Sequence, residues 1–366
     1  MYSPTFCFSP PWRRRDRFAG SRAAVAAASV LFTLGTAAPP VAVGGPLGLV
    51  LPTANKAIFS EHPEEFYQYT DRTFEGVRSK PWSGGRYGFV RDQKRTAAGI
   101  VFTKFHEGID IRPVKRDKAG EPLDDVFAIA DGKVVYVSTV SSRSNYGNYV
   151  VIQHDWGEGP FYSLYAHLKS VMIETGQPVK AGQRVARMGY TGAGINRERA
   201  HVHVELAMML SSRFQGWYDK HFTTRNWHGN YNGFNLAGID LAGLYHSHRD
   251  NPGIAASQFL SLAAPYYKVA VPNRGTPELL KRYPWLGRDM AKADGNRSWV
   301  FTFADTGVPL AIEPGDHQIA YPAVVWVKSS RIDHAYNTLA RINGTGSKAA
   351  LTASGSRYVQ LVTGAF

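Results

Sequence analysis

Three short segments contain residues whose types and spacing could bind a metal ion and activate water. They are His106–Asp110 (HEGID), Tyr165–Leu168 (YAHL) and Ala200–Leu206 (AHVHVEL). Along a β-strand, alternate side chains point to the same face. His201, His203 and Glu205 therefore share one face of a predicted strand, and the valine and leucine residues between them should face the core. Two histidines at this spacing are well placed to meet one metal ion or one metal-bound water.

An isolated H-x-H pattern is more often a pair of solvated histidines, so the first segment decides the interpretation. His106 and Asp110 are separated by Gly108 and can hold one ion from a short turn that enters a strand. Imidazole and carboxylate suit Zn²⁺, which takes three protein ligands and a water in catalytic sites. The segment differs from the helical H-E-x-x-H motif at Asp110, and Gly108 and Ile109 disfavour a helix. Glu107 is therefore not assigned as a catalytic base.

The order of these motifs resembles that of the lysostaphin-type (LytM) zinc endopeptidases, which cut peptide cross-links in bacterial cell walls. The intervening sequence is also similar to that family, over Gly147–His154, Val179–Val185 and Gly189–Gly192. The resemblance extends over roughly Gly88 to Leu206. It implies a mainly β catalytic domain, and a zinc-dependent endopeptidase acting on peptidoglycan.

The resemblance also implies roles for five residues. His106, Asp110 and His203 would hold one Zn²⁺ per chain, and His167 and His201 would handle the attacking water and the developing oxyanion. These roles agree with the chemistry of the residues, because zinc lowers the pKa of a bound water toward about 7. A neighbouring neutral histidine can then take the proton of that water.

Two features differ from the family pattern, which usually reads Gly-Pro-His-Leu-His-Phe-Glu at the last motif. This chain has RAHVHVE over Arg199–Glu205, and Ala193–Arg199 has the character of an altered or longer loop. Both differences concern the shape of a substrate groove more than the metal. Of the remaining histidines, His154 is interpreted as structural. His246 and His248 form a second H-x-H without valine-rich flanks and are interpreted as surface residues.

The elements that must position these residues are short strands. Val126–Ala130 and Lys133–Val137 flank Asp131-Gly132, which predicts a β-hairpin, and Asn148–Gln153 and Tyr162–Tyr165 predict two more strands. Frequent glycines close each brief strand. This pattern favours an antiparallel β-sheet or barrel-like domain, of the LytM type, over residues 81–211.

The sequence after Ser211 predicts a smaller C-terminal α+β accessory domain, residues 212–366, of unknown role. Within it we expect helices near Ala255–Leu262 and Pro277–Tyr283, and strands at Trp299–Phe303, Val324–Val327 and Tyr358–Val362. At the other end, residues 39–80 form a linker and N-terminal segment. Within it, Thr53–Arg78 has helix-like spacing of charged and aromatic residues.

The N-terminus has the layout of a secretory signal, residues 1–38, with an arginine cluster, an apolar run and small residues. The alternative is an uncleaved anchor, and only then would the protein contact a membrane. The signal predicts export to the periplasm or the extracellular cell envelope. The only cysteine, Cys7, lies within this leader, so the mature protein has neither a disulfide nor a thiol nucleophile.

The formal net charge of +13 attracts polyanions, which include nucleic acid and cell-envelope polymers. No nucleic-acid motif is recognised, and export argues against that partner.

The predicted partners are peptidoglycan stem or cross-bridge peptides, with a regulatory protein as a further one. The alternative function is a non-catalytic LytM-like regulator or wall-binding module. A biotin- or lipoyl-carrier domain is disfavoured because Met-Lys-Met is absent.

Overall fold

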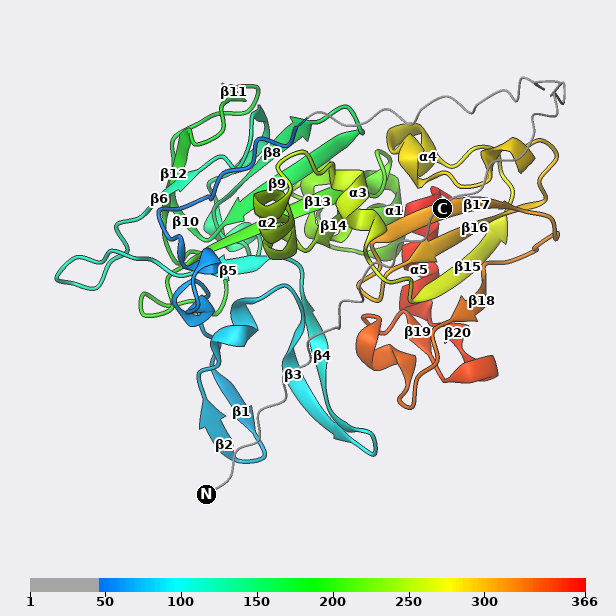
Figure 1. Cartoon of the computed structure of the whole chain (residues 1–366), viewed down its shortest axis with the longest axis horizontal. Helices are drawn as coiled ribbons and strands as arrows, with labels where there is room; N and C mark the ends of the chain where they lie inside the picture. The colour runs from blue at the N-terminus through cyan, green and yellow to red at the C-terminus, as the bar shows by residue number, and fades with distance from the viewer. Residues whose placement is uncertain (1–45) are drawn as a thin grey trace, which may run out of the picture. The chain divides into compact units, whose positions relative to one another are not determined.

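The computed structural model describes residues 46–366, and the predicted signal lies outside them. The central element is an antiparallel sheet in the order β11-β7-β8-β9-β13-β14 (Figure 1). Its strands are β11 (Pro178–Val179), β7 (Gly132–Ser138), β8 (Tyr149–Asp155), β9 (Pro160–Ala166), β13 (Val202–Met209) and β14 (Leu236–Ile239). A seventh strand, β5 (Ile109–Ile111), pairs with the first half of β13, and β14 pairs with the second half. The strand β13 therefore has neighbours along both of its edges.

A second, three-stranded antiparallel sheet lies against the apolar face of the central sheet. It consists of β10 (Leu168–Val171), β12 (Arg184–Met188) and β6 (Asp125–Phe127), in the order β10-β12-β6. The two sheets share one hydrophobic core, which includes Val126, Val185, Val202, Val204 and Leu206. The strand alternation that puts the valines and leucine of β13 in this core turns His203 and Glu205 to the opposite face. The predicted mainly antiparallel β architecture is confirmed.

The C-terminal region has its own antiparallel sheet, in the order β17-β16-β15-β18. The strands are β15 (Tyr267–Pro272), β16 (Ser298–Phe303), β17 (Pro309–Gly315) and β18 (Ala323–Val327). The helices are α1 (Phe214–His221), α2 (Leu241–Asp250), α3 (Ala256–Ser261), α4 (Glu278–Arg282) and α5 (Ala353–Thr363). This mixture of helices with a separate sheet agrees with the predicted α+β character.

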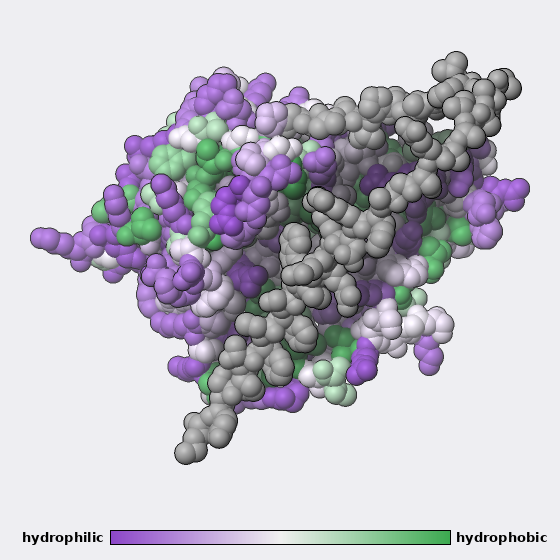
Figure 2. Space-filling model, viewed as in Figure 1, coloured by the Kyte–Doolittle hydropathy of each residue, from purple (hydrophilic) through white to green (hydrophobic). Residues whose placement is uncertain are grey.

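Three two-stranded ribbons complete the strands. They are β1 (Arg72–Phe74) with β2 (Val77–Ser79), β3 (Gly88–Thr96) with β4 (Gly99–His106), and β19 (Ile342–Asn343) with β20 (Ala350–Leu351). The β3–β4 ribbon is the longest of the three, as Figure 1 shows, and it ends at His106. No helix among residues 46–366 is long and apolar enough to cross a membrane. Polar residues cover most of the face seen in Figure 2, with hydrophobic residues in separate patches.

The C-terminal region is joined to the central sheet by buried hydrogen bonds. The hydroxyl of Tyr283 donates to the carbonyl of Pro160 (2.7 Å) and accepts from the amide of Met209 (3.0 Å). The indole of Trp285 donates to the carbonyl of Glu158 (2.8 Å). These contacts satisfy backbone groups at the ends of β9 and β13, which would otherwise be buried without partners.

The predicted hairpin at Asp131-Gly132 is wrong. The strand before it, β6, pairs with β12, whereas β7 pairs with β8 and β11. A two-residue type I′ turn needs positive φ at both central residues, and neither Asp131 nor Gly132 has it. Instead, the Asp131 carboxylate accepts from the amide of Ala181 (2.9 Å) and the ammonium of Lys180 (2.7 Å). The chain turns a corner between two sheets at this point.

Two further predictions of local structure are wrong. The segment Tyr358–Val362 is part of the helix α5, because its buried residues recur with the helical period and Thr352 caps the first turn. The segment Thr53–Arg78 contains only the 3₁₀ turns η1 (Ala57–Phe59) and η2 (Pro63–Glu65) and the β1–β2 ribbon. Pro63 begins the second of these turns.

His154 is fully buried in β8, where its Nδ1 donates to the carbonyl of Asp131 (2.8 Å) and its Nε2 lies 2.7 Å from the hydroxyl of Ser163. Burial lowers the pKa of His154 to about 4, despite the opposing hydrogen bond to Asp131. A histidine in the unfolded chain has a pKa near 6.5. Between these two values the unfolded chain binds a proton that the folded protein does not.

We therefore expect the free energy of unfolding to fall as the pH drops from about 6.5 toward 4, by roughly 2 to 3 kcal/mol from this residue. In the variant His154→Gln this part of the pH dependence should disappear. Urea unfolding at pH 7 and pH 4.5 measures it, with His317→Gln as an exposed control. Equal pH dependence in wild type and His154→Gln would contradict the structural role.

Candidate metal centre

The ends of β4 and β5 bring His106 and Asp110 to the edge of β13. His106 is the last residue of β4, and Asp110 lies directly opposite His203 in the β5–β13 register. The intervening turn packs so closely on β13 that a Cβ on Gly108 would lie 2.4 Å from the carbonyl oxygen of Val204. Glycine is therefore required between the two residues. Strand pairing thus places Asp110 beside His203, and the tight turn at Gly108 brings His106 to the same place.

The three side chains converge on one buried point. The Oδ1 atom of Asp110 lies 3.1 Å from Nε2 of His106 and 2.9 Å from Nδ1 of His203, and these two nitrogens are 3.0 Å apart. All three residues are buried, and they form a group that could hold a metal ion.

The outward-facing nitrogens fix which atoms can bind a cation. Nδ1 of His106 lies 2.8 Å from the carbonyl of Arg86, which can only accept, so the neutral ring carries its proton there. Nε2 of His203 lies 3.0 Å from the carboxylate of Glu205, so its proton points outward as well. Two nitrogen lone pairs and one carboxylate oxygen then face each other. This donor set fits Zn²⁺.

The electrostatics also favour a positive charge at this point. Burial lowers the pKa of His203, but its hydrogen bonds to Asp110 and Glu205 outweigh that effect and raise it to about 10. Burial raises the pKa of Asp110, yet the nearby His106 and His201 rings hold it well below its usual range. A proton on His203 and a metal ion beside it would therefore compete for the same position.

Two outer contacts hold the ligand side chains in place. The guanidinium of Arg91, on β3, donates to Oδ2 of Asp110 (2.6 Å) and to the carbonyl of Gly84 (2.7 Å), which leaves Oδ1 for the ion. The hydroxyl of Tyr146 donates to the Glu205 oxygen that faces His203 (2.6 Å). Sequence reasoning missed both Arg91 and Tyr146, because neither lies within a motif.

His167 and His201 lie beside this group. Their rings are 4.8 Å apart, and Nε2 of His201 is 3.4 Å from Oδ1 of Asp110. Their Nδ1 atoms face backbone carbonyls, at 2.9 Å from Thr191 for His167 and 2.7 Å from Arg199 for His201. Among residues 46–366, Nε2 of His167 is therefore left without a hydrogen bond, whereas Nε2 of His201 faces the Asp110 carboxylate. Burial, together with His201 and His203, holds the pKa of His167 well below its usual range, so this ring is neutral.

The backbone of His167 is held in an uncommon conformation. Its φ is +62°, in the left-handed region that few residues other than glycine adopt. Its amide donates to the carbonyl of Tyr146 (2.8 Å), and the amide of Leu168 donates to the carbonyl of Asn148 (3.0 Å). The loop that carries Tyr146 thus fixes the position of His167. All five predicted site residues are brought together in one place.

The other histidines lie elsewhere. His154 is in the core, and neither it nor the helical pair His246 and His248 belongs to a potential metal-binding group among residues 46–366. A second such group, Glu107 with His203 and Glu205, shares His203 with the first.

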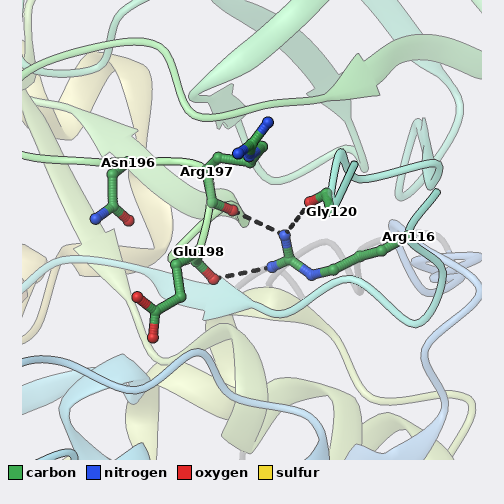
Figure 3. Close-up of a pocket in the computed structure, with 5 residues that line it drawn as sticks. All are labelled: Arg116, Gly120, Asn196, Arg197 and Glu198. Atoms are coloured by element: carbon green, nitrogen blue, oxygen red, sulfur yellow. Dashed lines mark hydrogen bonds between the residues drawn. The ribbon is translucent and has the colours of Figure 1, made fainter. Parts of the chain in front are cut away.

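The loop before His201 is fixed by the loop that follows β5. The guanidinium of Arg116 donates to the carbonyls of Gly120 (2.8 Å), Arg197 (2.8 Å) and Glu198 (3.0 Å), as Figure 3 shows. These residues, with Asn196, line an open cavity of about 510 Å³. The altered loop sequence is thus part of an ordered contact.

A buried donor set of two histidines and one aspartate on an antiparallel sheet is consistent with a metal site of the kind that zinc peptidases use. The family model Peptidase family M23 matches residues 104–213. The sequence is 37% identical over 76 residues to the Lipoprotein NlpD of Yersinia enterocolitica, covering 21% of this chain and 73% of that protein. The chain belongs to peptidase family M23, which confirms the resemblance to the lysostaphin-type (LytM) enzymes.

Other relatives are matched over a smaller share of their own length. The Murein hydrolase activator NlpD of Escherichia coli is 37% identical over 92 residues, which is 25% of this chain and 21% of that protein. The chain thus spans about a fifth of the length of this relative. Among solved structures, a zinc containing peptidase from Vibrio cholerae is 26% identical, with a TM-score of 0.25 over 39% of this chain and 36% of that one. The catalytic domain of lysostaphin from Staphylococcus simulans is 23% identical, with a TM-score of 0.24; the match covers 38% of this chain and 79% of that one.

We expect the variant Glu205→Gln to bind zinc about 10- to 100-fold more weakly, because a neutral amide no longer supports the outward proton of His203. Competition with a chelator of known affinity measures this change on the purified protein. The control is Glu174→Gln, which makes the same change at an exposed glutamate in the turn between β10 and β11. Equal affinity of the Glu205→Gln and wild-type proteins would show that Glu205 does not orient His203.

Proposed function

We propose that this protein is a zinc-dependent endopeptidase that hydrolyses peptide cross-links of bacterial peptidoglycan. The observation that supports this proposal most directly is the complete donor set, with His106, Asp110 and His203 as ligands of one zinc ion. Two more histidines, His167 and His201, turn their Nδ1 atoms to backbone carbonyls and their Nε2 atoms toward this group. Residues 81–211 would form the catalytic domain and residues 212–366 an accessory domain.

Zn²⁺ bound by the three ligands would polarise the scissile carbonyl group and make water nucleophilic near neutral pH. His167 is neutral, and its free Nε2 can accept the proton of the attacking water. A histidine protonated in this step can then donate to the developing oxyanion or to the leaving amine. Because the backbone carbonyls of Thr191 and Arg199 hold both rings, little reorganisation is needed during the reaction.

A second candidate function is activation of another wall hydrolase. It is favoured by the relative that is named a murein hydrolase activator. In that case the groove would bind a regulatory protein partner and no bond would be cut. The filled donor set favours the enzyme, because an activator has no need of two buried histidines and an aspartate around one point.

The proposed location is the cell envelope, after export to the periplasm or the exterior. Several relatives are named lipoproteins, among them the Yersinia enterocolitica protein and the Outer membrane antigenic lipoprotein B of Histophilus somni. A basic protein, with a formal net charge of +13, would also be attracted to anionic wall polymers.

We expect His167→Ala and His201→Ala to retain one zinc per chain but to lose hydrolysis of purified peptidoglycan by at least about 100-fold. The variant His203→Ala should lose both zinc and activity. Mass spectrometry of the released fragments, together with metal analysis of each protein, measures the two effects separately. The control is His246→Ala, a histidine on α2 outside the centre.

The same assay separates the two candidate functions. Cross-link cleavage by the wild-type protein that stops with a chelator supports the endopeptidase. If the zinc-loaded wild type releases no fragments alone but increases release by a second wall hydrolase, the activator function replaces it.

A further inference from the structure

The metal centre lies at one end of a sheet face that is otherwise lined with aromatic rings. The ring of His203 is 5.8 Å from that of Tyr146, which is 5.2 Å from Tyr149. Tyr149 in turn lies 5.3 Å from His228. Tyr149 belongs to a buried cluster that is separate from the main core, and Tyr146 packs against that cluster. A continuous layer of rings thus leads from the centre to the segment around His228.

A stretch that we call the cover segment, residues 226–236, lies over this face. The hydroxyl of Tyr149 donates to the carbonyl of Tyr231 (3.2 Å), and that of Tyr136 lies 3.3 Å from the carbonyl of Trp227. The amide of Asn235, which is fully buried, donates to the carbonyl of Asn230 (3.0 Å). The cover segment is therefore held in place by side chains that donate hydrogen bonds to its backbone carbonyls.

The edge of this wall carries exposed aromatic and basic side chains. Trp227 is 42% exposed. The guanidinium carbon of Arg225 lies 4.0 Å from the centre of its ring, and that of Arg143 lies 4.5 Å from it. Neither arginine has an acidic side chain within ion-pair distance among residues 46–366. Two positive charges thus converge on one exposed ring without a counter-charge.

This group lies within a short peptide's length of the candidate metal centre. The steps between ring centres, from His203 through Tyr146 and Tyr149 to His228, place the first and last rings at most about 16 Å apart. His228 follows Trp227 in the chain, and its Nε2 lies 3.3 Å from the carbonyl of Arg143. An extended peptide rises about 3.3 Å per residue, so about five residues span the distance between the two rings.

We propose that Arg143, Arg225 and Trp227 form a subsite that binds the carboxylates of an acidic stem peptide. The inference rests on the proposed function and names its substrate class: peptides with side-chain carboxylates, such as those containing diaminopimelate, in preference to neutral glycine bridges. Guanidinium groups pair with carboxylates in a fixed geometry, and the Trp227 ring packs against the aliphatic part of the substrate. A glycine bridge offers neither group.

Binding to zinc-stripped protein tests the subsite without requiring hydrolysis. Titration calorimetry compares a diaminopimelate-containing stem tetrapeptide with the same peptide whose carboxylates are amidated. We expect the full-length protein to bind the acidic peptide about tenfold more tightly, and this preference should weaken as salt is raised above about 0.15 M. In the double variant Arg143→Gln/Arg225→Gln the two peptides should bind equally.

The matched control is Arg249→Gln, because Arg249 is stacked on a different ring, Phe59, at 5.2 Å. It should keep the wild-type preference, and thermal unfolding of each variant checks that the fold is retained. Equal binding of both peptides by the wild type, no binding of either, or an unchanged preference in the double variant would each overturn the subsite. Absence of cleavage with a retained preference would refute the proposed hydrolysis but leave the subsite intact.

Discussion

The structure depends on the convergence of three buried atoms: Nε2 of His106, Nδ1 of His203 and Oδ1 of Asp110. When both rings are neutral and carry their protons on the outward nitrogens, all three atoms present lone pairs, which repel each other unless a metal ion or a proton on His203 lies between them. The sheet forces the convergence, because the register of β5 and β13 sets Asp110 opposite His203, and the turn at Gly108 has no room for a side chain. The site is therefore built by strand pairing rather than by a helical motif.

Backbone carbonyls, rather than side chains, set the orientation of three histidines. Those of Arg86, Thr191 and Arg199 face Nδ1 of His106, His167 and His201, respectively. A carbonyl is present whatever the residue type, so the loops can change in sequence without altering which nitrogen points inward. This explains how the unusual sequence before His201 is compatible with an intact centre. Only His203 depends on a side chain, that of Glu205.

The five candidate site residues could be predicted because each lies in a short motif whose residue types and spacing indicate metal binding. Arg91 and Tyr146 could not, since their contacts with Asp110 and Glu205 arise from strands and loops that are distant in sequence. The same limit applies to the fold. The strands were recognised from their valine, isoleucine and tyrosine content and the glycines between them, but Asp131-Gly132 joins two sheets instead of closing a hairpin, and no local pattern distinguishes these cases. The segment Tyr358–Val362 was predicted as a strand from five residues, which are too few to show the helical period that its apolar side chains follow over the whole of α5.

The segment that matches the family, residues 104–213, contains the candidate metal-binding residues, but some of their surroundings come from outside it. Arg91 approaches Asp110 from the preceding ribbon, and the cover segment approaches Tyr149 from the following region. The family match therefore includes the residues proposed for the chemistry, whereas Arg225 and Trp227 of the proposed subsite lie outside it. Under the proposed function, the charges of this subsite, rather than the metal ligands themselves, should decide which peptide is bound.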